Sequence, residues 1–487
     1  MLTCLFPDWR RTEQMISILG CLIAVLGSLM FLPAAIDLAF VNEDWHAFVA
    51  AGCMSVSVGV ALFLVGRHQN TGWTTKNSII FVNALWIFVC FFAALPLYLS
   101  SLELSFTDAF FETASGLTTT GSTVLNGLDN MAPGILFWRS MLQWIGGLGI
   151  VAIGVSILPS LGTGGQRLFY MESSDQSDKP FPRVREFAGR IILIYLLLTT
   201  LCAFAYFELG MSVFEAINHS MTTVSTGGFS TSDDSIWHFH SLGILVVASF
   251  FMFLGGLPFL YLIKLFSPNP VHDPQVRLYF FGVIAASLLI FTCKEVLYPE
   301  GAWHDLVFAL FNVISIVTTT GFAAGDYQLW GALFGAVFLV LTFFGACSGS
   351  TSGGLKQFRF VVIWQMIRQS IMTLGRPHQI VPMRYANRSI SDDIVSSTLG
   401  LVFIFFATFM IFGLMLEIGG LDFITAMSAS ATALANVGPG LGEVIGPAGN
   451  FSSLPDFDKW LLSVEMILGR LEILSGYALL LPSFWKW

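Results

Sequence analysis

The sequence is short of charged residues: only 11% of its 487 residues are Asp, Glu, Lys or Arg. Soluble domains typically carry about 25%, so the shortage argues against an ordinary soluble protein. The chain has no basic domain, no zinc-finger spacing and no stacked aromatic motif, and these absences argue against a nucleic-acid partner. Hydrophobic residues make up 55% of the chain instead, which predicts a polytopic protein embedded in a lipid bilayer.

Paired cysteines and catalytic motifs are missing as well. The seven cysteines form no CxxC pair, and most lie inside apolar runs, which favours small buried hydrophobic side chains. The sequence shows no Ser-His-Asp set, no His-Glu-x-x-His motif and no carboxylate pair at a shared depth, so it does not predict an enzyme. No cleavable signal peptide is evident, because the first apolar run has about 26 residues and suits a membrane span better.

Ten apolar stretches are long enough to cross a bilayer, which takes roughly 20 residues. They are residues 15–40, 45–65, 78–99, 134–158, 188–209, 242–266, 276–297, 332–355, 393–418 and 460–481. Four shorter apolar pieces lie between them, at residues 105–117, 212–224, 305–317 and 422–434. Each has about 13 residues, which is too short to cross a bilayer but right for a re-entrant segment.

The basic residues predict which ends of the spans face the cytoplasm. With the N-terminus inside, ten crossings place the C-terminus and the loops at 67–76, 161–190, 264–277 and 356–392 inside as well. These inside segments hold 18 of the 22 basic residues, and the outer loops hold only Lys294 and Lys459. This strong positive-inside pattern predicts that both termini are cytoplasmic and that all four re-entrant pieces lie on the outer side.

Each re-entrant piece is followed by a stretch with a glycine at or near its end, and the fourth of these stretches is the weakest copy. The four stretches are SGLTTTG (115–121), TVSTGGF (223–229), IVTTTGF (316–322) and ALANVGP (433–439). Ser105 with Asp108 and Ser212 with Glu215 indicate capping boxes that start short helices. After two leading spans, the order span, short helix, glycine-ended strand, span therefore occurs four times. Internal repeats of this length favour pseudo-symmetry around a shared site.

The predicted fold is an all-α polytopic membrane protein. Two leading transmembrane helices precede four pseudo-symmetric repeats of helix, pore helix and helix around a central cation pore. The predicted units are an N-terminal two-helix domain (1–76), pore repeat 1 (77–160), pore repeat 2 (161–267), pore repeat 3 with an intramembrane gate loop at 345–354 (268–357), a cytoplasmic linker (358–392) and pore repeat 4 (393–487).

The predicted hairpins have the chemistry of a cation filter. A short helix that runs inward from the outer face points its C-terminus at the membrane centre, where its partial negative charge favours a cation. Extended chain at this depth is tolerated only where protein or a water-filled cavity satisfies its backbone. Four such strands around one axis present rings of carbonyl oxygens that can replace the hydration shell of a hard monovalent cation. The alternative interpretation is that Ser, Thr and Gly mediate close helix packing.

Two features bear on gating. The run GACSGSTSGGLK (345–356) contains four glycines and cannot form a good helix, so we expect it to line a cavity. A flexible exit loop on the cytoplasmic side is the alternative. Arg470 falls inside the last apolar stretch, where a positive charge below a cation filter would raise the barrier to passage. An ion pair with Glu465 or Glu472 is its structural alternative, and both interpretations can hold together.

Two other small groups of residues have less specific interpretations. Arg139 and Gln143 lie four residues apart, on one face of a predicted helix, which predicts a polar contact behind the first filter strand. The pair Gly255-Gly256 predicts close helix packing.

These stretches, taken together, resemble the Trk potassium-uptake family, the membrane subunit of the TrkH/TrkG type in bacteria. The matching segments are FFETASGLTTTGSTV, RSMLQWIGGLGIVAIGVSILP, STGGFSTSD, TTTGF, GACSGSTSGGLK, NVGPGLG and GRLEILS, which span about residues 105 to 476. The two spans before the first repeat also fit the Trk branch of this superfamily.

The resemblance implies potassium uptake across the bacterial inner membrane by a homodimer in which each subunit carries its own pore. It implies a cytosolic ring of nucleotide-binding regulatory subunits of the TrkA type, and no cofactor besides potassium as the transported ion. The implied potassium-binding positions are Thr119, Thr120 and Gly121; Ser225, Thr226 and Gly227; Thr319, Thr320 and Gly321; and Asn436, Val437 and Gly438. The implied gate comprises Gly345, Gly349, Gly353, Gly354 and Arg470.

Two departures from the family pattern matter for function. Ser348 and Ser352 stand where the family's loop usually has small residues, which bears on gate packing. The fourth filter stretch reads Asn-Val-Gly, so its side chains break the symmetry of the filter. A sodium or mixed-cation transporter of the same fold is therefore the alternative function, although Gly121 favours potassium. A passive channel and a proton- or sodium-coupled symporter both fit the sequence.

Overall fold

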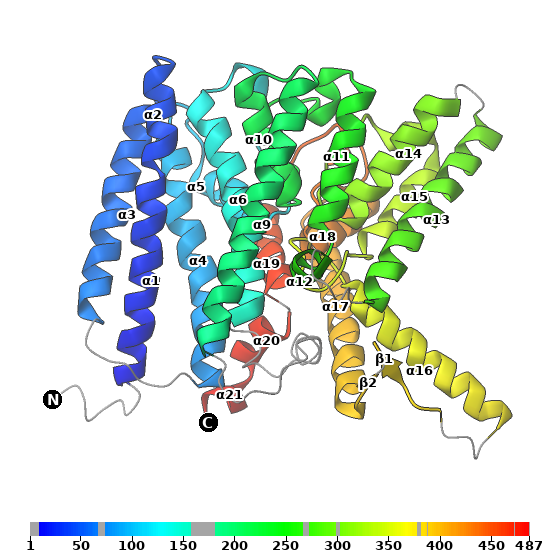
Figure 1. The fold of residues 1–487 in the computed structure, drawn as a ribbon. Helices are drawn as coiled ribbons and strands as arrows, with labels where there is room; N and C mark the ends of the chain where they lie inside the picture. The colour runs from blue at the N-terminus through cyan, green and yellow to red at the C-terminus, as the bar shows by residue number, and fades with distance from the viewer. Residues whose placement is uncertain are drawn as a thin grey trace.

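The computed structural model describes residues 9–66, 74–156, 181–265, 272–298, 302–376, 381–386, 388–471 and 473–486. These residues are almost entirely helical. Within them, the β structure is one hairpin of two short strands, β1 (Arg384–Tyr385) and β2 (Arg388–Ser389), and a single isolated bridge. The all-helical membrane architecture expected from the composition is therefore confirmed (Figure 1).

Seven segments of the described chain are continuous helices, or nearly so, that are long and apolar enough to cross a membrane. They comprise α1 (Trp9–Leu29) with α2 (Phe31–Ala39), α3 (Trp45–Val65), α4 (Thr75–Leu99), α6 (Pro133–Ser156), α9 (Phe181–Glu208), α13 (Pro274–Leu297) and α17 (Asp392–Ile418). They correspond to seven of the ten predicted spans. Many of their apolar side chains, such as Leu193, Phe281 and Phe403, are exposed on the outside of the molecule, as expected for surfaces that face lipid.

The other three predicted spans are not continuous helices in the structure. The first divides into α11 (Leu242–Gly255) and α12 (Phe259–Leu265), which bend by 99°. Pro258 lies at this break, and a proline lacks the N–H that helix continuation needs. The last divides into α19 (Asp456–Arg470), α20 (Leu474–Leu480) and α21 (Pro482–Trp485).

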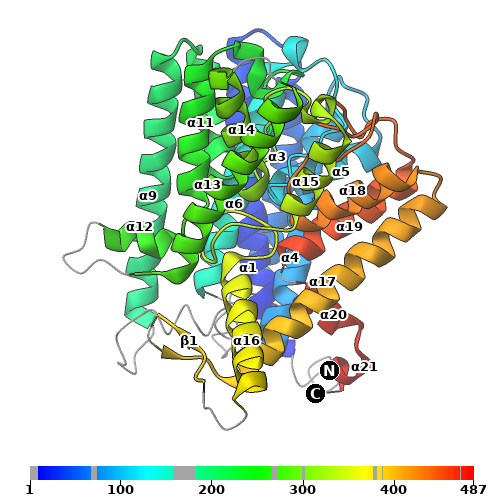
Figure 2. The same cartoon turned by 90° about the vertical axis from the view of Figure 1, so that its right-hand side faces the viewer.

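The third broken span is the one that the glycine-rich run interrupts. Helix α15 (Ala332–Thr342) ends after 11 residues, and α16 (Gln357–Gly375) begins only beyond the run. The segment expected as a simple cytoplasmic linker therefore opens with a helix of 19 residues and continues into the β1–β2 hairpin. In Figures 1 and 2, α16 and this hairpin lie at the same end of the molecule as α20 and α21.

Four short helices form the predicted re-entrant segments. They are α5 (Phe106–Leu117), α10 (Val213–Val224), α14 (Ala302–Val317) and α18 (Phe423–Ala435). Ser212 and Glu215 form a complete capping box at the start of α10, and the Ser105 hydroxyl accepts a bond from the Asp108 backbone N–H at the start of α5. Asp422 caps α18 in the same way. Each cap fixes the residue at which its short helix begins.

The repeats close into a ring because repeat 4 returns to repeat 1. Helix α19 packs along α5, and Lys459 Nζ reaches Asp108 Oδ1 at 2.6 Å across the join. Beside this contact, the backbone N–H of Phe451 donates to the Thr123 carbonyl at 2.8 Å. The segments that follow the first three hairpins also contain short 3-10 turns, η2 (Leu128–Asn130), η3 (Ser235–Phe239) and η4 (Tyr327–Trp330). The pore helices thus end around one common centre.

Candidate ion pathway

Every pore helix ends in the same turn. A residue with left-handed backbone follows each helix: Thr119 (φ 55°), Thr226 (φ 54°), Thr319 (φ 58°) and Asn436 (φ 56°). Two positions later comes a glycine with positive φ: Gly121 (90°), Gly228 (80°), Gly321 (79°) and Gly438 (110°). The residue between them donates its backbone N–H to a carbonyl of the preceding pore helix at 2.8–2.9 Å. The four bonds are Thr120 to Ser115, Gly227 to Thr222, Thr320 to Ser315, and Val437 to Thr432.

This shared geometry corrects the register of the second hairpin by one residue. The sequence placed Ser225, Thr226 and Gly227 in line with Thr119, Thr120 and Gly121. The structure instead aligns Thr226, Gly227 and Gly228 with that triplet, and Ser225 caps α10. Two glycines follow Thr226, and only the backbone angles reveal which of them takes the left-handed conformation. The triplets that the sequence proposed for the other three hairpins share a common register.

The four glycines form a ring in which each packs against the next hairpin. A Cβ atom added to any of them would come within 3.0 Å of a backbone carbonyl oxygen. The pairs run in cyclic order: Gly121 against Gly227, Gly228 against Thr320, Gly321 against Val437 and Gly438 against Thr120. Four segments from distant parts of the chain therefore surround one axis. Their close approach and positive φ leave glycine as the residue that fits.

Helix α6 clamps the first two hairpins together from behind. Arg139 is 1% exposed, and its Nε lies 2.7 Å from Glu112 Oε1 on α5. Its other nitrogens donate to the Ser230 carbonyl at 3.0 Å and to Thr123 Oγ1 at 3.2 Å, and its guanidinium lies 4.2 Å from the Phe229 ring centre. The sequence predicted that Arg139 makes a polar contact behind the first hairpin strand, and the structure shows that it also bonds the strand of the second hairpin.

Gln143 completes this clamp one helical turn further along α6. Its Nε2 donates to the Gly227 carbonyl at 2.6 Å, and its Oε1 accepts from the Phe229 N–H at 3.0 Å. One of the four carbonyls of the ring is therefore bound by a side chain. The ring has a fourfold backbone pattern, but the side chains around it do not follow that pattern.

Asn436 breaks the symmetry at the fourth hairpin. Its Nδ2 donates to Thr120 Oγ1 and to the Met466 carbonyl, both at 2.9 Å. Within the described part of the chain, the buried oxygens Thr119 Oγ1 and Asn436 Oδ1 have no hydrogen-bond partner. Neutral oxygens of this kind suit a hard cation such as an alkali metal ion, and both belong to the left-handed positions at the ends of the pore helices.

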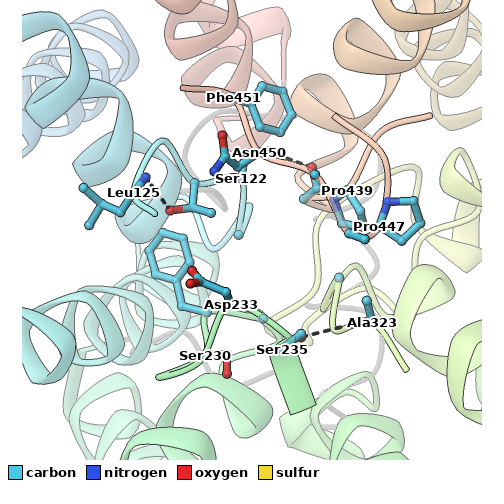
Figure 3. Close-up of a pocket in the computed structure, with 18 of the residues that line it drawn as sticks. Ser122, Leu125, Ser230, Asp233, Ser235, Ala323, Pro439, Pro447, Asn450 and Phe451 are labelled. Atoms are coloured by element: carbon cyan, nitrogen blue, oxygen red, sulfur yellow. Dashed lines mark hydrogen bonds between the residues drawn. The ribbon is translucent and has the colours of Figure 1, made fainter. Parts of the chain in front are cut away.

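A polar cavity of about 310 Å³ lies outside the ring and is lined by all four hairpins, including their ring glycines (Figure 3). Asp233 is its one acidic lining residue, and its carboxylate accepts bonds from the N–H groups of Gly127 and Leu128 at 3.0 and 3.2 Å. Arg139 is its one basic lining residue, but Glu112 neutralises it. The mouth of the pathway therefore carries a net negative charge that attracts cations.

Beneath the ring, residues 343–356 form a closed loop. The N–H of Gly345 donates to the Leu355 carbonyl at 2.8 Å, so the two ends of the loop lie together. Its interior residues Cys347 and Thr351 are fully buried. The expected alternative, a flexible exit loop, does not fit a segment packed this deeply. The structure places Gly349 (φ 80°) and Gly354 (φ 65°) at its turns.

The broken span of repeat 2 supplies partners for this loop. The N–H groups of Cys347 and Thr351 donate to the carbonyls of Gly256 and Gly255 at 3.1 and 3.3 Å. These carbonyls lack helical partners because α11 ends there. The prediction that Gly255-Gly256 marks helix packing alone was therefore incomplete: the pair marks a helix end that receives the loop.

The loop also reaches the base of the hairpins. The N–H of Gly353 donates to Thr319 Oγ1 at 2.6 Å, and Thr351 Oγ1 donates to the Val224 carbonyl at 3.2 Å. Thr226 Oγ1 bonds Thr351 Oγ1 at 3.2 Å. Thr226 and Thr319 therefore bond to the loop, and Gly353 also packs against Asn436 of the fourth hairpin. Thr119 and Asn436 carry the unpartnered oxygens described above.

Arg470 lies at the end of α19, 3% exposed, and its Nη2 donates to the Thr351 carbonyl at 2.9 Å. Its Nε and Nη1 have no partner among the described residues. Glu465, one expected partner, instead accepts a bond from Ser430 Oγ at 2.5 Å. The other expected partner, Glu472, lies outside the described residues. The Arg470 guanidinium therefore bonds the loop through Nη2, while its Nε and Nη1 groups lie beneath the hairpins without a described partner.

Comparisons with known proteins agree with one another along nearly the whole chain. A family model described as TrkH, cation transport protein, matches residues 45–272 and 298–483. The Trk system potassium uptake protein TrkI of Halomonas elongata is 40% identical over 484 residues, covering 98% of both chains. The Trk system potassium uptake protein TrkH of Escherichia coli K12 is 34% identical over 480 residues, covering 96% of this chain and 98% of its own. The crystal structure of the potassium transporter TrkH from Vibrio parahaemolyticus matches with a TM-score of 0.89 at 32% identity, covering 97% of this chain and 99% of that one.

The corrected register predicts different outcomes for two neighbouring glycines. We expect Gly228→Ala to abolish cation flux, because its new Cβ would strike the Thr320 carbonyl at a φ of +80°. Gly227→Ala should reduce flux only in part, because its Cβ meets the Gln143 side chain and not a backbone carbonyl, and its φ is not positive. The measurement is radioactive rubidium influx into vesicles that contain equal amounts of each folded variant. The opposite order of severity would restore the register that the sequence suggested.

The charge of the vestibule predicts a second outcome. Asp233→Asn should raise the cation concentration that gives half-maximal flux by about 2- to 5-fold, because one nearby charge contributes on the order of 1 kcal/mol near water. The maximal flux should stay the same, and the effect should fade as ionic strength rises. Asp234→Asn is the matched control, since Asp234 is exposed but does not line the cavity. Equal effects of the two variants would contradict a local role for Asp233.

Proposed function

Because the chain belongs to the TrkH family of cation transport proteins and is a Trk-system potassium uptake protein, we propose that potassium passes through the ring of four hairpins. The protein is thus a multi-pass membrane transporter of the bacterial Trk system and not an enzyme. The observation that carries the proposal is the cyclic packing of Gly121, Gly228, Gly321 and Gly438 against the carbonyls of neighbouring hairpins. Carbonyl oxygens held this close to one axis can replace the water around a dehydrated potassium ion.

The proposed potassium-binding residues are the twelve that share the common register. They are Thr119, Thr120 and Gly121; Thr226, Gly227 and Gly228; Thr319, Thr320 and Gly321; and Asn436, Val437 and Gly438. Ser225 leaves the set that the resemblance implied, and Gly228 enters it. The C-termini of the four pore helices end at this set, so their partial negative charges add to the attraction of the oxygens for a cation.

The loop at 343–356 and Arg470 are proposed as the gate. The loop lies directly beneath the hairpins, and its Gly353 and Thr351 contact the second and third of them. A buried guanidinium at this position repels a potassium ion that leaves the filter, as positive groups do in other selective pores. Gly345, Gly349, Gly353 and Gly354 let the loop fold on itself without a helix. Opening then requires the loop and Arg470 to move away from the axis.

The cellular setting is part of the same proposal. An inner-membrane position with cytoplasmic termini is supported by the excess of basic residues in the predicted inside segments. It is also supported by Figure 1, in which α1 begins and α21 ends at the same end of the molecule. Assembly as a homodimer with a cytosolic nucleotide-binding regulator of the TrkA type is proposed from the family resemblance. The β1–β2 hairpin and α16 lie on the side where such a regulator would approach.

Gly121→Ser tests the filter. A side chain at φ +90° would displace the Gly227 carbonyl that it meets, so we expect the ratio of potassium to sodium flux to fall severalfold. The measurement is potassium and sodium influx into vesicles that contain the purified protein. Gly400→Ser is the matched control, because a Cβ at Gly400 meets nothing within 4 Å. An unchanged flux ratio in Gly121→Ser would count against the filter assignment, and sodium selectivity in the wild-type protein would favour the alternative cation.

Arg470→Ala tests the gate. Removal of the charge and of the bond to Thr351 should raise potassium flux severalfold at the same driving force. Arg470→Lys should give an intermediate flux, since it keeps the charge but loses the forked donors. The same vesicle assay reads both variants. Loss of all flux in well-folded Arg470→Ala protein would show that the side chain holds the pathway together instead of closing it.

A further inference from the structure

The cytoplasmic β1–β2 hairpin packs into the base of the protein, and Tyr385 is one of the residues that make this contact. Arg384 and Tyr385 are consecutive in β1, and the first is exposed while the second is 2% exposed. This alternation is the period of a strand that covers a core with one face. The Tyr385 ring packs edge-on against Phe358 at the start of α16, with ring centres 5.1 Å apart. Met383, Ile390, Ile394, Val395 and Val362 complete this small core.

The hydroxyl group of Tyr385 begins a chain of buried polar contacts. It donates to Asp273 Oδ1 at 2.5 Å, and the other carboxylate oxygen of Asp273 accepts from Gln275 Nε2 at 2.9 Å. Gln275 Oε1 then accepts from the backbone N–H of Ser348, at 2.9 Å. Asp273 and Gln275 are 7% and 4% exposed, so water competes little for these bonds. The chain thus joins the cytoplasmic hairpin to the loop beneath the filter.

The point of attachment on the loop is close to its contacts with the filter. Ser348 precedes Gly349. Phe259, the first residue of α12, donates its backbone N–H to the Gly349 carbonyl at 3.0 Å. Thr351 follows two residues later and carries the bonds to Val224, Thr226 and Arg470 described above. A displacement of Ser348 therefore acts on the part of the loop that Arg470 holds under the hairpins.

We propose that Tyr385, Asp273 and Gln275 are positioning residues that link the cytoplasmic hairpin to the gate loop and keep the loop in its closed position. The inference rests on the proposed function, since it assigns a control element to the same gate. These residues do not touch the transported ion, and they act only through the backbone of Ser348. A contact that displaces the hairpin from the cytoplasmic side would reach the gate along this chain.

The first test measures potassium flux in vesicles that contain purified Tyr385→Phe, Gln275→Met or both changes. Tyr385→Phe keeps the ring that packs on Phe358 and removes the hydroxyl that donates to Asp273. We expect each single variant to raise flux by about 3- to 10-fold, as loss of one hydrogen bond to a charged or buried group allows. The double variant should show no further rise, because both changes cut the same chain. The potassium-to-sodium flux ratio should not change.

The second test measures how often the loop opens and does not depend on a transport assay. Cys347 is fully buried beside Ser348, and its rate of alkylation by N-ethylmaleimide reports how often the loop opens. Peptide mass spectrometry of the purified full-length protein should show faster alkylation of Cys347 in Tyr385→Phe. Cys90 and Cys202, which are equally buried in α4 and α9, are internal controls that should keep their wild-type rates. Faster alkylation of all three would indicate general loosening and would overturn the proposal.

Tyr477→Phe is the matched control for the loss of a tyrosine hydroxyl. Its hydroxyl bonds Thr408 at 2.9 Å on another helix pair, so neither flux nor Cys347 alkylation should change. Unchanged flux and unchanged Cys347 reactivity in Tyr385→Phe and Gln275→Met would overturn the inference. If Gly121→Ser still altered selectivity in that case, the proposed function would stand. If wild-type vesicles carried no potassium, the proposed function would fail, while Cys347 reactivity would still test the link.

Discussion

The need to satisfy every backbone polar group at membrane depth governs this structure. Water cannot reach most of these groups, and an unpaired one costs several kcal/mol in an apolar environment. Seven spans meet the requirement as continuous helices or near-continuous helix pairs. The four hairpins and the loop at 343–356 cannot, and each of them is therefore surrounded by specific partners. The N–H groups of the hairpins return to the pore helices, while the carbonyls of the ring residues crowd around one axis. A cation is the natural partner for oxygens arranged in this way.

The two broken helices depend on each other for the same reason. Helix α11 ends at Gly255 and leaves carbonyls without helical partners, and the loop after α15 has N–H groups without them. Cys347 and Thr351 bring these groups together. Arg470 then adds one donor to the Thr351 carbonyl. The loop at 343–356 is consequently held by these hydrogen bonds together with the apolar core that Ala346, Cys347 and Leu355 join.

The backbone repeats are more alike than their side-chain surroundings. Four left-handed residues and four ring glycines follow one pattern, yet Arg139 and Gln143 brace only the first two hairpins. Asn436 carries an amide where the other hairpins carry threonine, and it ties the fourth hairpin to the first. The backbone of the four hairpins is therefore nearly symmetric, whereas the side chains that support it differ from one hairpin to the next.

The sequence by itself determined the class of protein, the positions of the four short helices and the glycine-containing stretches that follow them. These features depend on local composition and periodicity, since about 20 apolar residues span a bilayer and 13 do not. Only the tertiary structure decided the register at Gly227-Gly228, because both residues are glycine and a backbone angle distinguishes them. It also decided that α11 ends beside the loop at 343–356 and that Arg470 bonds Thr351 instead of Glu465. These contacts join residues that lie far apart in the chain, so no local pattern could reveal them.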